Sequence, residues 1–295
     1  MKRQIEGFKQ YLTVEKRSSK NTVESYIRDL LQFSQFCTSL KINNAQKVKT
    51  ATINSYLEYL SKEKKSDATK ARITASLRAF FRYLISIGVV NENPVNDAVK
   101  NKVSKKLPGV LDASEIVLLL SQPSGDDYKS IRDKAMLELL YATGIKVSEL
   151  LELTVHDFNL QLGILHLRNG KKERIIPIYP AAVKSVTEYL VNVRPAIVLE
   201  TEQDKLFTNM NGAPMSRQGF WKLIKHYALE AGIKEEITPH TLRHSFAAHL
   251  LENGAKLQDI KEMLGHSDIS STQIYAQYIK NKYTSNYAKF HPLAK

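Results

Sequence analysis

The residue types best suited to chemistry gather in the C-terminal third of the chain. The stretch TPHTLRHS places His240, Arg243 and His244 within five positions. His266 follows in LGHSD, and Tyr275 comes nine residues after it. The first question is therefore which reaction needs several histidines, an arginine and a tyrosine close together.

A metal-free attack on a phosphodiester uses these residue types. Tyrosine can act as a nucleophile that forms a covalent intermediate. Arginine offers a permanently charged fork that matches phosphate geometry, and histidine exchanges protons near neutral pH. This set of residue types is compatible with phosphoryl transfer. For any one of the histidines taken alone, the simpler interpretation is a polar residue packed between helices.

A metal site is the competing interpretation of the histidines. His240 and His244 are four residues apart, which is one helical turn and a spacing that can hold zinc. No glutamate follows His240 as in HExxH, no cysteine lies nearby, and Arg243 would repel a cation. The sequence therefore predicts no metal ligand.

Charge points to a polyanionic partner for the N-terminal part. Residues 1–107 contain 21 Lys and Arg against 9 Asp and Glu, whereas the remainder contains 22 against 21. Such a basic segment most often binds nucleic acid, and a merely solubilising surface is the alternative.

The remaining composition indicates a cytoplasmic globular protein. Apolar runs are far shorter than the roughly 18 to 20 residues that span a bilayer, and no secretion signal is recognisable at the start. The single Cys37 cannot form an internal disulfide, which fits a reducing compartment, and its apolar neighbours predict that it is buried.

The N-terminal region predicts four helices, near residues 2–16, 21–37, 52–64 and 67–86. Asn21, followed by Glu24, is the expected N-cap of the second helix, and Asp67 that of the fourth. Apolar residues recur at helical spacing in the fourth helix, at Ile73, Leu77, Phe81 and Leu84. A compact four-helix, DNA-binding domain over residues 1–100 follows.

Basic side chains project from the other faces of the fourth predicted helix. Helix-borne cations of this kind contact phosphates and position a protein on DNA. The candidate DNA-binding residues are Lys70, Arg72, Arg78 and Arg82.

A second domain is predicted over residues 111–295, after a basic linker at 101–110 that closes with Pro-Gly. Most of this domain has helical periodicity, with Gly144 as a helix C-cap. GILHLRNGKKERIIPI reads as a β-hairpin around Asn169-Gly170. The expected fold class is mainly α, with a small antiparallel β-sheet in the second domain.

The spacing of the reactive residues resembles a known family. PHTLRHSFAAHLLENGAKLQDIKEMLGHSDISSTQIY is similar, almost residue for residue, to the C-terminal signature of the tyrosine recombinases, particularly the Xer type. RDKAMLELLYATGIKVSELLELTVHDFN resembles the start of that family's catalytic domain, and YAKFHPLAK its C-terminal tail. The resemblance covers essentially the whole chain.

The resemblance implies a role for each matching position. Tyr275 corresponds to the nucleophile that takes the DNA 3′-phosphate and releases a 5′-hydroxyl. Arg243 corresponds to a phosphate clamp, His240 to the proton-handling histidine and His266 to a phosphate-binding partner. Glu149 matches a supporting residue. His244 and His249 match no catalytic position, so a structural role is expected for both.

Two positions depart from the family pattern. Lys146 stands in ATGIKVSEL where the family has the first phosphate-clamping arginine. Lysine keeps the charge but loses the fork. Loss of one good transition-state contact raises the barrier by about 3 kcal/mol, on the order of a hundredfold in rate.

The hairpin turn is the second departure. The family usually has Gly-Lys-Gly there, with its lysine as general acid for the leaving 5′-oxygen, whereas this chain reads RNGKKER. Lys171 is the better candidate for that role and Lys172 the alternative.

The implied function is site-specific DNA recombination through a 3′-phosphotyrosine intermediate, attenuated by Lys146. A diverged DNA-binding relative without recombination activity and a type IB topoisomerase-like enzyme remain as alternatives. The family implies no metal or other cofactor, a double-stranded DNA site, a homo- or hetero-tetramer on two sites, and a DNA translocase as a further partner.

Overall fold

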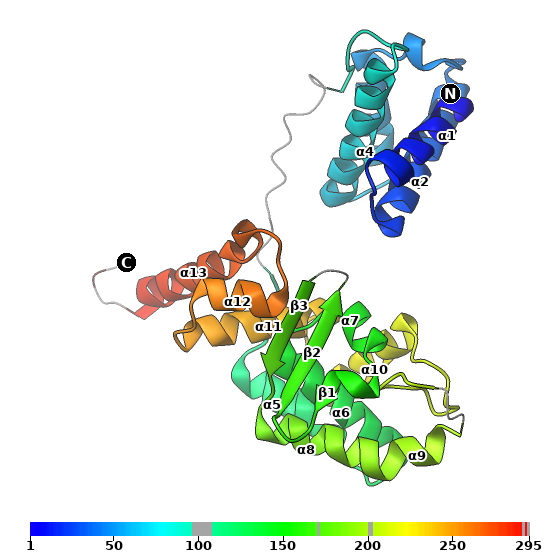
Figure 1. Cartoon of the computed structure of the whole chain (residues 1–295). Helices are drawn as coiled ribbons and strands as arrows, with labels where there is room; N and C mark the ends of the chain where they lie inside the picture. The colour runs from blue at the N-terminus through cyan, green and yellow to red at the C-terminus, as the bar shows by residue number, and fades with distance from the viewer. Residues whose placement is uncertain (96–107, 170–171, 200–202, 291–292, 294–295) are drawn as a thin grey trace. The chain divides into compact units, whose positions relative to one another are not determined.

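The computed structural model separates into two compact units, Met1–Lys105 and Lys106–Lys295 (Figure 1). The structure describes residues 1–95, 108–169, 172–199, 203–290 and 293. Most of the predicted linker at 101–110 lies outside the described residues, so its conformation stays a prediction.

The N-terminal unit is a bundle of four helices, as predicted. They are α1 (Lys2–Gln10, continued by a π-helical turn at Tyr11–Glu15), α2 (Lys20–Ser39), α3 (Thr50–Lys62) and α4 (Asp67–Ser86), with a 3-10 turn at Ala45–Lys47. Aromatic rings hold its centre: Phe8 packs edge-on against Phe80 at 5.5 Å between ring centroids, and Phe33 against Tyr56 at 5.0 Å. Cys37 is fully buried in this core.

Both predicted caps in this unit are wrong by one or two residues. The N-cap of α2 is Ser19, whose hydroxyl accepts a hydrogen bond from the Thr22 amide at 3.2 Å. The N-cap of α4 is Ser66, bonded in the same way to the Thr69 amide. In each case the serine and threonine hydroxyls also bond to each other, so a Ser-x-x-Thr pair closes the helix start one or two residues before the predicted cap.

Arg72 ties α4 to α2. One of its terminal nitrogens forms an ion pair with the buried carboxylate of Asp29 and donates to the Ser25 hydroxyl at 2.8 Å. Asp29 also accepts from the Ser76 hydroxyl. The buried carboxylate of Asp29 needs such partners. Arg72 therefore has a structural role in addition to its predicted contact with DNA.

The C-terminal unit is mainly helical and carries one small sheet (Figure 1). Its described helices are α5 (Ala113–Ser121), α6 (Tyr128–Thr143), α7 (Val147–Glu152), α8 (Pro180–Glu188), α9 (Arg194–Ile197), α10 (Arg217–Glu230), α11 (Pro239–Glu252), α12 (Leu257–Leu264) and α13 (Gln273–Phe290). Short turns of helix occur at Val155–Asp157, Tyr189–Val193 and Ile269–Ser271.

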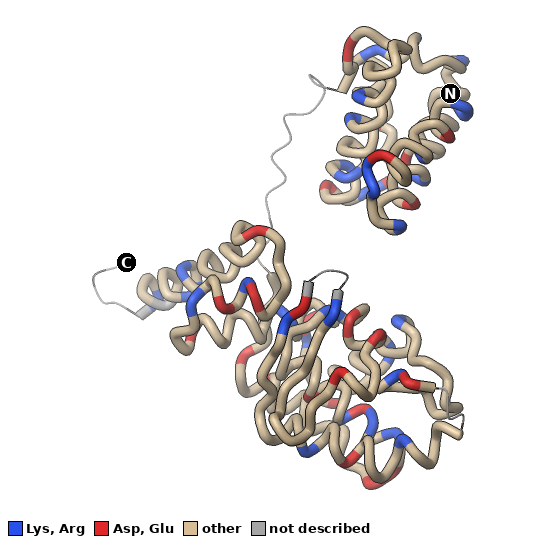
Figure 2. Tube along the Cα trace, in the orientation of Figure 1, with Lys and Arg blue, Asp and Glu red and all other residues tan. Residues whose placement is uncertain are grey.

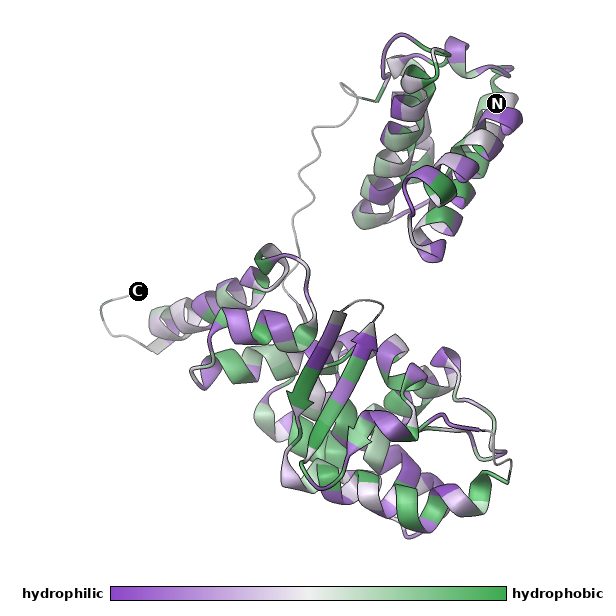
Figure 3. Cartoon of the chain, viewed as in Figure 1, coloured by the Kyte–Doolittle hydropathy of each residue, from purple (hydrophilic) through white to green (hydrophobic). Residues whose placement is uncertain are grey.

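The predicted hairpin forms two of the three antiparallel strands, which lie in the order β1 (Phe158–Asn159), β2 (Ile164–Asn169) and β3 (Lys172–Pro177). Asn169 pairs with Lys172, and the register continues to Leu165 opposite Ile176, both fully buried. Figure 3 shows β3 hydrophilic where it starts and hydrophobic where it ends, so only its far end lies in the core.

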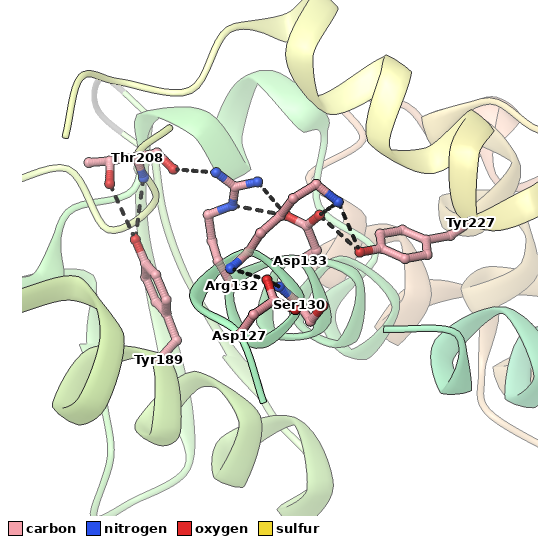
Figure 4. A network of polar contacts seen from close by, with 8 residues as sticks. Asp127, Ser130, Arg132, Asp133, Tyr189, Thr208 and Tyr227 are labelled. Atoms are coloured by element: carbon pink, nitrogen blue, oxygen red, sulfur yellow. Dashed lines mark hydrogen bonds and ion pairs between the residues drawn. The ribbon is translucent and has the colours of Figure 1, made fainter. Parts of the chain in front are cut away.

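A buried polar network fixes α6 within this unit (Figure 4). Arg132 donates to Asp133 at 2.6 and 2.9 Å, and Asp133 accepts from the Tyr227 hydroxyl of α10 at 3.1 Å. Arg132 also reaches the backbone carbonyl of Thr208 at 3.4 Å. Paired in this way, the two buried charges link α6 to α10 and to the segment around Thr208.

Gly144 ends α6 in the left-handed conformation, as predicted, with φ +58°. A Cβ atom there would lie 2.2 Å from the Phe246 ring of α11. The glycine is therefore required both by its backbone angle and by the close approach of α11.

Candidate active site

Arg243 occupies the centre of the candidate site on α11. Its side chain is buried, and its two terminal nitrogens donate to the carbonyls of Gly144 at 2.6 Å and Leu264 at 2.7 Å. These carbonyls close the ends of α6 and α12, so two helix C-termini fix the guanidinium in place. Helix C-termini carry partial negative charge, which favours a cation at that position.

Tyr275 lies in the first turn of α13 and is 1% exposed. Its ring packs in a small core with Phe246, Ile260 and Leu264, and its hydroxyl forms a 2.9 Å hydrogen bond with Nδ1 of His244. The predicted nucleophile is therefore buried in this structure and has a histidine as its partner.

The other two candidate histidines differ in surroundings. His240, at the start of α11, is exposed, with its ring centroid 6.3 Å from that of His244. His266 follows Gly265 at the end of α12 and is half-buried, with Nδ1 hydrogen-bonded to the Thr272 hydroxyl at 3.0 Å. His249 pairs with the Tyr141 hydroxyl at 2.9 Å, which agrees with the structural role expected for it.

Burial and neighbouring cations keep two of these histidines neutral. Burial, with contributions from His240, Arg243 and His266, lowers the pKa of His244 to about 4. Burial, Arg243, Lys146 and Arg174 lower the pKa of His266 to about 4. Burial raises the pKa of the Tyr275 hydroxyl, and nearby Arg243 opposes this. At neutral pH the tyrosine and both histidines are therefore uncharged.

Lys146 precedes α7 with an exposed side chain, in contrast to Arg243. Its backbone amide donates to the Glu149 carboxylate at 2.8 Å, so Glu149 fixes the main chain at this position. The charges of Lys146 and Arg243 both lower the pKa of His266, so both cations lie near this histidine.

Arg174 was missed by sequence reasoning, although it is two residues from the predicted Lys172. From β3 it donates to the Glu149 carboxylate at 2.7 Å, and its side chain is 16% exposed. A Cβ atom at Gly265 would lie 1.8 Å from a terminal nitrogen of Arg174. The glycine of LGH thus leaves the space in which this guanidinium lies.

Two buried polar atoms in this ion pair have no hydrogen-bond partner among the described residues, Nε of Arg174 and Oε1 of Glu149. Arg174, Gly265 and His266 also line a groove of about 780 Å³ between β3 and α12. Beside the candidate site, Arg174 can therefore donate, and Glu149 accept, one further hydrogen bond.

Other predicted site residues are less closely defined. Lys171 lies outside the described residues, and only the backbone of Lys172 is described, at the start of β3. In the N-terminal unit, Lys70 forms an ion pair with Asp67 at 2.8 Å, Arg78 is half-buried and Arg82 is exposed. Figure 2 shows Lys and Arg along the helices of this unit.

No group of three or more His, Cys, Asp or Glu side chains that could hold a metal ion occurs among the described residues. Within the same residues, no helix is long and apolar enough to cross a membrane.

Comparison with known proteins gives the family. Residues 109–282 match the phage integrase family, and residues 5–88 match the phage integrase N-terminal SAM-like domain. Because the first match covers more than half of the chain, the chain belongs to the phage integrase family, and it is a tyrosine recombinase.

Individual relatives agree over nearly the full length. The chain is 44% identical to tyrosine recombinase XerD of Halalkalibacterium halodurans, over 98% of both chains. It is 40% identical to tyrosine recombinase XerD of Staphylococcus aureus, over 98% of this chain and 99% of that one. The predicted Xer-type resemblance is therefore confirmed.

Solved structures show the same fold. The XerH site-specific recombinase bound to its palindromic difH substrate matches with a TM-score of 0.78 and 22% identity, over 92% of this chain and 80% of that one. The XerA recombinase matches with a TM-score of 0.55 and 26% identity, over 98% of this chain and 99% of that one. The predicted mainly helical fold with a small antiparallel sheet is also confirmed.

Proposed function

We propose that the chain cleaves and rejoins DNA at specific sites through a covalent 3′-phosphotyrosine at Tyr275. The observation that carries this proposal is the meeting of α11 and α13, where the Tyr275 hydroxyl lies beside the helix that holds Arg243. A nucleophile and a fixed guanidinium on adjacent helices are the minimum for attack on a phosphodiester.

The proposed reaction conserves the phosphodiester bond energy. The Tyr275 oxygen attacks phosphorus, the bond from phosphorus to the 5′-oxygen breaks, and the 5′-oxygen leaves as a hydroxyl after gaining a proton. A 5′-hydroxyl from a second strand then attacks the phosphotyrosine, and Tyr275 regains its proton. The protein supplies the nucleophile and the cations, so the proposal needs no metal or other cofactor.

Other side chains have roles consistent with their positions. Arg243 would hold two non-bridging oxygens with its fork, and exposed His240 would exchange protons with solvent. His266 would donate a hydrogen bond to the phosphate, since its neutral ring retains one N–H. Lys171 is proposed as the acid for the 5′-oxygen, with Lys172 as the alternative.

Lys146 is proposed to slow this reaction. Its exposed ammonium is a point charge on a flexible stem, so it holds the phosphate in one orientation less well than an arginine fork. Binding to DNA should hardly change, because many phosphate contacts contribute to affinity.

The assay for this proposal uses nicked duplexes carrying a site selected by binding from a random DNA pool. A nick close to the cut releases a short fragment, so the covalent adduct accumulates and can be scored on a denaturing gel. We expect an adduct from the chain and none from Tyr275→Phe. Tyr278→Phe is the matched control, because this tyrosine lies one turn further along α13 and should leave the adduct unchanged.

Other outcomes would support the alternative functions. Site binding without an adduct would support a DNA-binding relative that has lost its chemistry. Relaxation of supercoiled plasmid without strand exchange would support a topoisomerase-like enzyme.

The proposed partners are a double-stranded DNA site and three further recombinase protomers, identical or paired with a second recombinase. Lys70, Arg72, Arg78 and Arg82 would contact the DNA backbone. A DNA translocase is a further proposed partner, and the cytoplasm, where DNA is accessible, is the expected compartment.

Residues 283–295 are proposed to dock on a neighbouring protomer. Tyr283 and Tyr287 of this segment are 62% and 59% exposed. Lys282 pairs with Glu252 of α11 at 2.8 Å, which anchors the chain just before this segment. Deletion of residues 284–295 should weaken cooperative assembly in a gel-shift titration and leave half-site binding intact; unchanged cooperativity would contradict this.

A further inference from the structure

The proposed nucleophile, Tyr275, forms a hydrogen bond with the side chain of His244. Its Nδ1 lies 2.9 Å from the Tyr275 hydroxyl, and the ring centroids are 5.7 Å apart. The family resemblance gives this position no catalytic role, so the contact has to be explained from the geometry.

The direction of this hydrogen bond follows from the chemistry of both groups. The pKa of the Tyr275 hydroxyl is raised by burial, so the phenol keeps its proton. His244 is neutral at pH 7, and a neutral imidazole has one nitrogen with a free lone pair. With Nδ1 as that acceptor, the O–H of Tyr275 donates to it and Nε2 carries the ring proton.

The proton of the nucleophile must leave during attack. Tyr275 is 1% exposed, so bulk water cannot collect the proton at this position. Arg243 cannot accept one, and no other hydrogen bond to the Tyr275 hydroxyl is present among the described residues. His240 is exposed, with its ring centroid 6.3 Å from that of His244.

We propose that His244 is a catalytic residue: its Nδ1 accepts the Tyr275 proton as the phenolic oxygen attacks phosphorus, and returns it on religation. This inference rests on the proposed function of Tyr275. In the forward step the oxygen–phosphorus bond forms, the bond to the 5′-oxygen breaks, and His244 becomes an imidazolium. The acid that protonates the 5′-oxygen is a separate group.

The surroundings make this transfer depend on DNA. Without DNA, burial and the nearby guanidinium of Arg243 disfavour a positive charge on His244, so the proton stays on Tyr275. A phosphodiester bound at Arg243 would bring a negative charge to the same region and offset that effect. His244 thereby becomes able to accept the proton when the substrate is in place.

Two substitutions separate proton transfer from simple positioning. His244→Asn places an amide oxygen near the position of Nδ1, so it can accept the hydrogen bond but not the proton. His244→Leu removes both abilities. We expect the single-turnover rate of adduct formation to fall on the order of a hundredfold in both variants, with half-site binding and circular dichroism unchanged.

A substrate with sulfur in place of the bridging 5′-oxygen identifies the side of the reaction on which His244 acts. A thiolate leaves without an acid, so this substrate rescues variants that lack the leaving-group acid. We expect it not to rescue His244→Asn or His244→Leu, because the defect lies at the nucleophile.

The outcomes are distinct. The role of His244 would be overturned by any of three results. These are full activity of His244→Asn, rescue of either variant by the sulfur substrate, and a rate of adduct formation in His244→Leu that equals or exceeds that of the unaltered chain. Absence of any adduct from the unaltered chain would instead overturn the proposed function of Tyr275.

Discussion

The two sides of the candidate site differ in how firmly their cations are held. On the α11 side, Arg243 is buried and donates to two backbone carbonyls, and Tyr275 has a histidine partner. On the α7 side, Lys146 has an exposed side chain, and its backbone amide is held by the Glu149 carboxylate. The departure from the family pattern at Lys146 falls on this second side.

The difference indicates which departures from the family pattern the candidate site can accept. A change at Arg243 would leave buried carbonyls without donors, whereas a change at Lys146 alters an exposed charge and leaves the fold intact. The α7 side also has Arg174, which holds Glu149 and contributes a guanidinium within the same region. The geometry therefore indicates that the two sides contribute unequally to adduct formation.

The largest expected effect is on catalysis at Arg243. Arg243→Lys removes the fork and at least one of the two carbonyl bonds, so the adduct rate should fall by on the order of a hundredfold or more. Lys146→Ala, the matched change on the α7 side, should cost about tenfold or less. Single-turnover assays compare the two, and equal losses would show that the sides contribute alike.

A smaller effect is expected at Gly265. An alanine there adopts an unfavourable φ of +66° and displaces the Arg174 guanidinium from Glu149. Gly232→Ala is the control, because Gly232 has φ +65° with nothing near a new Cβ. Both should lose about 1–3 kcal/mol in the free energy of unfolding from backbone strain, measured by urea denaturation. Only Gly265→Ala should also slow adduct formation. Equal adduct rates in Gly265→Ala and Gly232→Ala would show that the position of Arg174 does not affect the reaction.

The pH dependence of stability should report the buried histidines. The folded-state pKa values of His244 and His266 are near 4, below their ordinary value of 6.5, so the fold favours their neutral forms. This contribution is complete above about pH 6.5 and decreases as the pH falls towards 4. The free energy of unfolding should therefore drop less between pH 7 and 5 in His244→Asn than in the unaltered chain. An identical drop would contradict the neutral state assigned to His244.

The smallest effect is expected at Glu149. Glu149→Gln keeps an oxygen for the Lys146 amide but loses the charge that pairs with Arg174, at a cost of about 1–2 kcal/mol in the free energy of unfolding. Glu152→Gln is the control, since Glu152 pairs with Lys205 from an exposed position, 77% accessible. Equal thermal unfolding shifts in the two variants would show that the buried pair adds nothing.

Sequence periodicity was sufficient for most of the fold. The apolar stripe at Ile73, Leu77, Phe81 and Leu84 is buried in α4, and the Asn-Gly signal gave the hairpin. The two N-caps were predicted wrongly because Asn21 and Asp67 are also good capping residues by type. The observed caps are Ser19 and Ser66, and each accepts a hydrogen bond from the amide of a threonine three residues later. Residue type alone does not decide between neighbouring candidates.

The site was less completely predictable, because its contacts join segments far apart in the chain. The pairing of His244 with Tyr275 spans 31 residues, and that of Arg174 with Glu149 spans 25. The spacing that indicated the family gave the candidate reactive groups but not their hydrogen-bond partners. Arg72 shows the reverse case, since a cation on a helix surface by periodicity is paired with the buried Asp29.

The most direct test of the central claim is the rate of covalent adduct formation by the chain and by Lys146→Arg, on the same nicked substrate. The account predicts an adduct from both, faster in Lys146→Arg by on the order of a hundredfold, and none when Tyr275→Phe is added to either. Equal rates would contradict an attenuating role for Lys146. An adduct that survives Tyr275→Phe would contradict the assignment of the nucleophile.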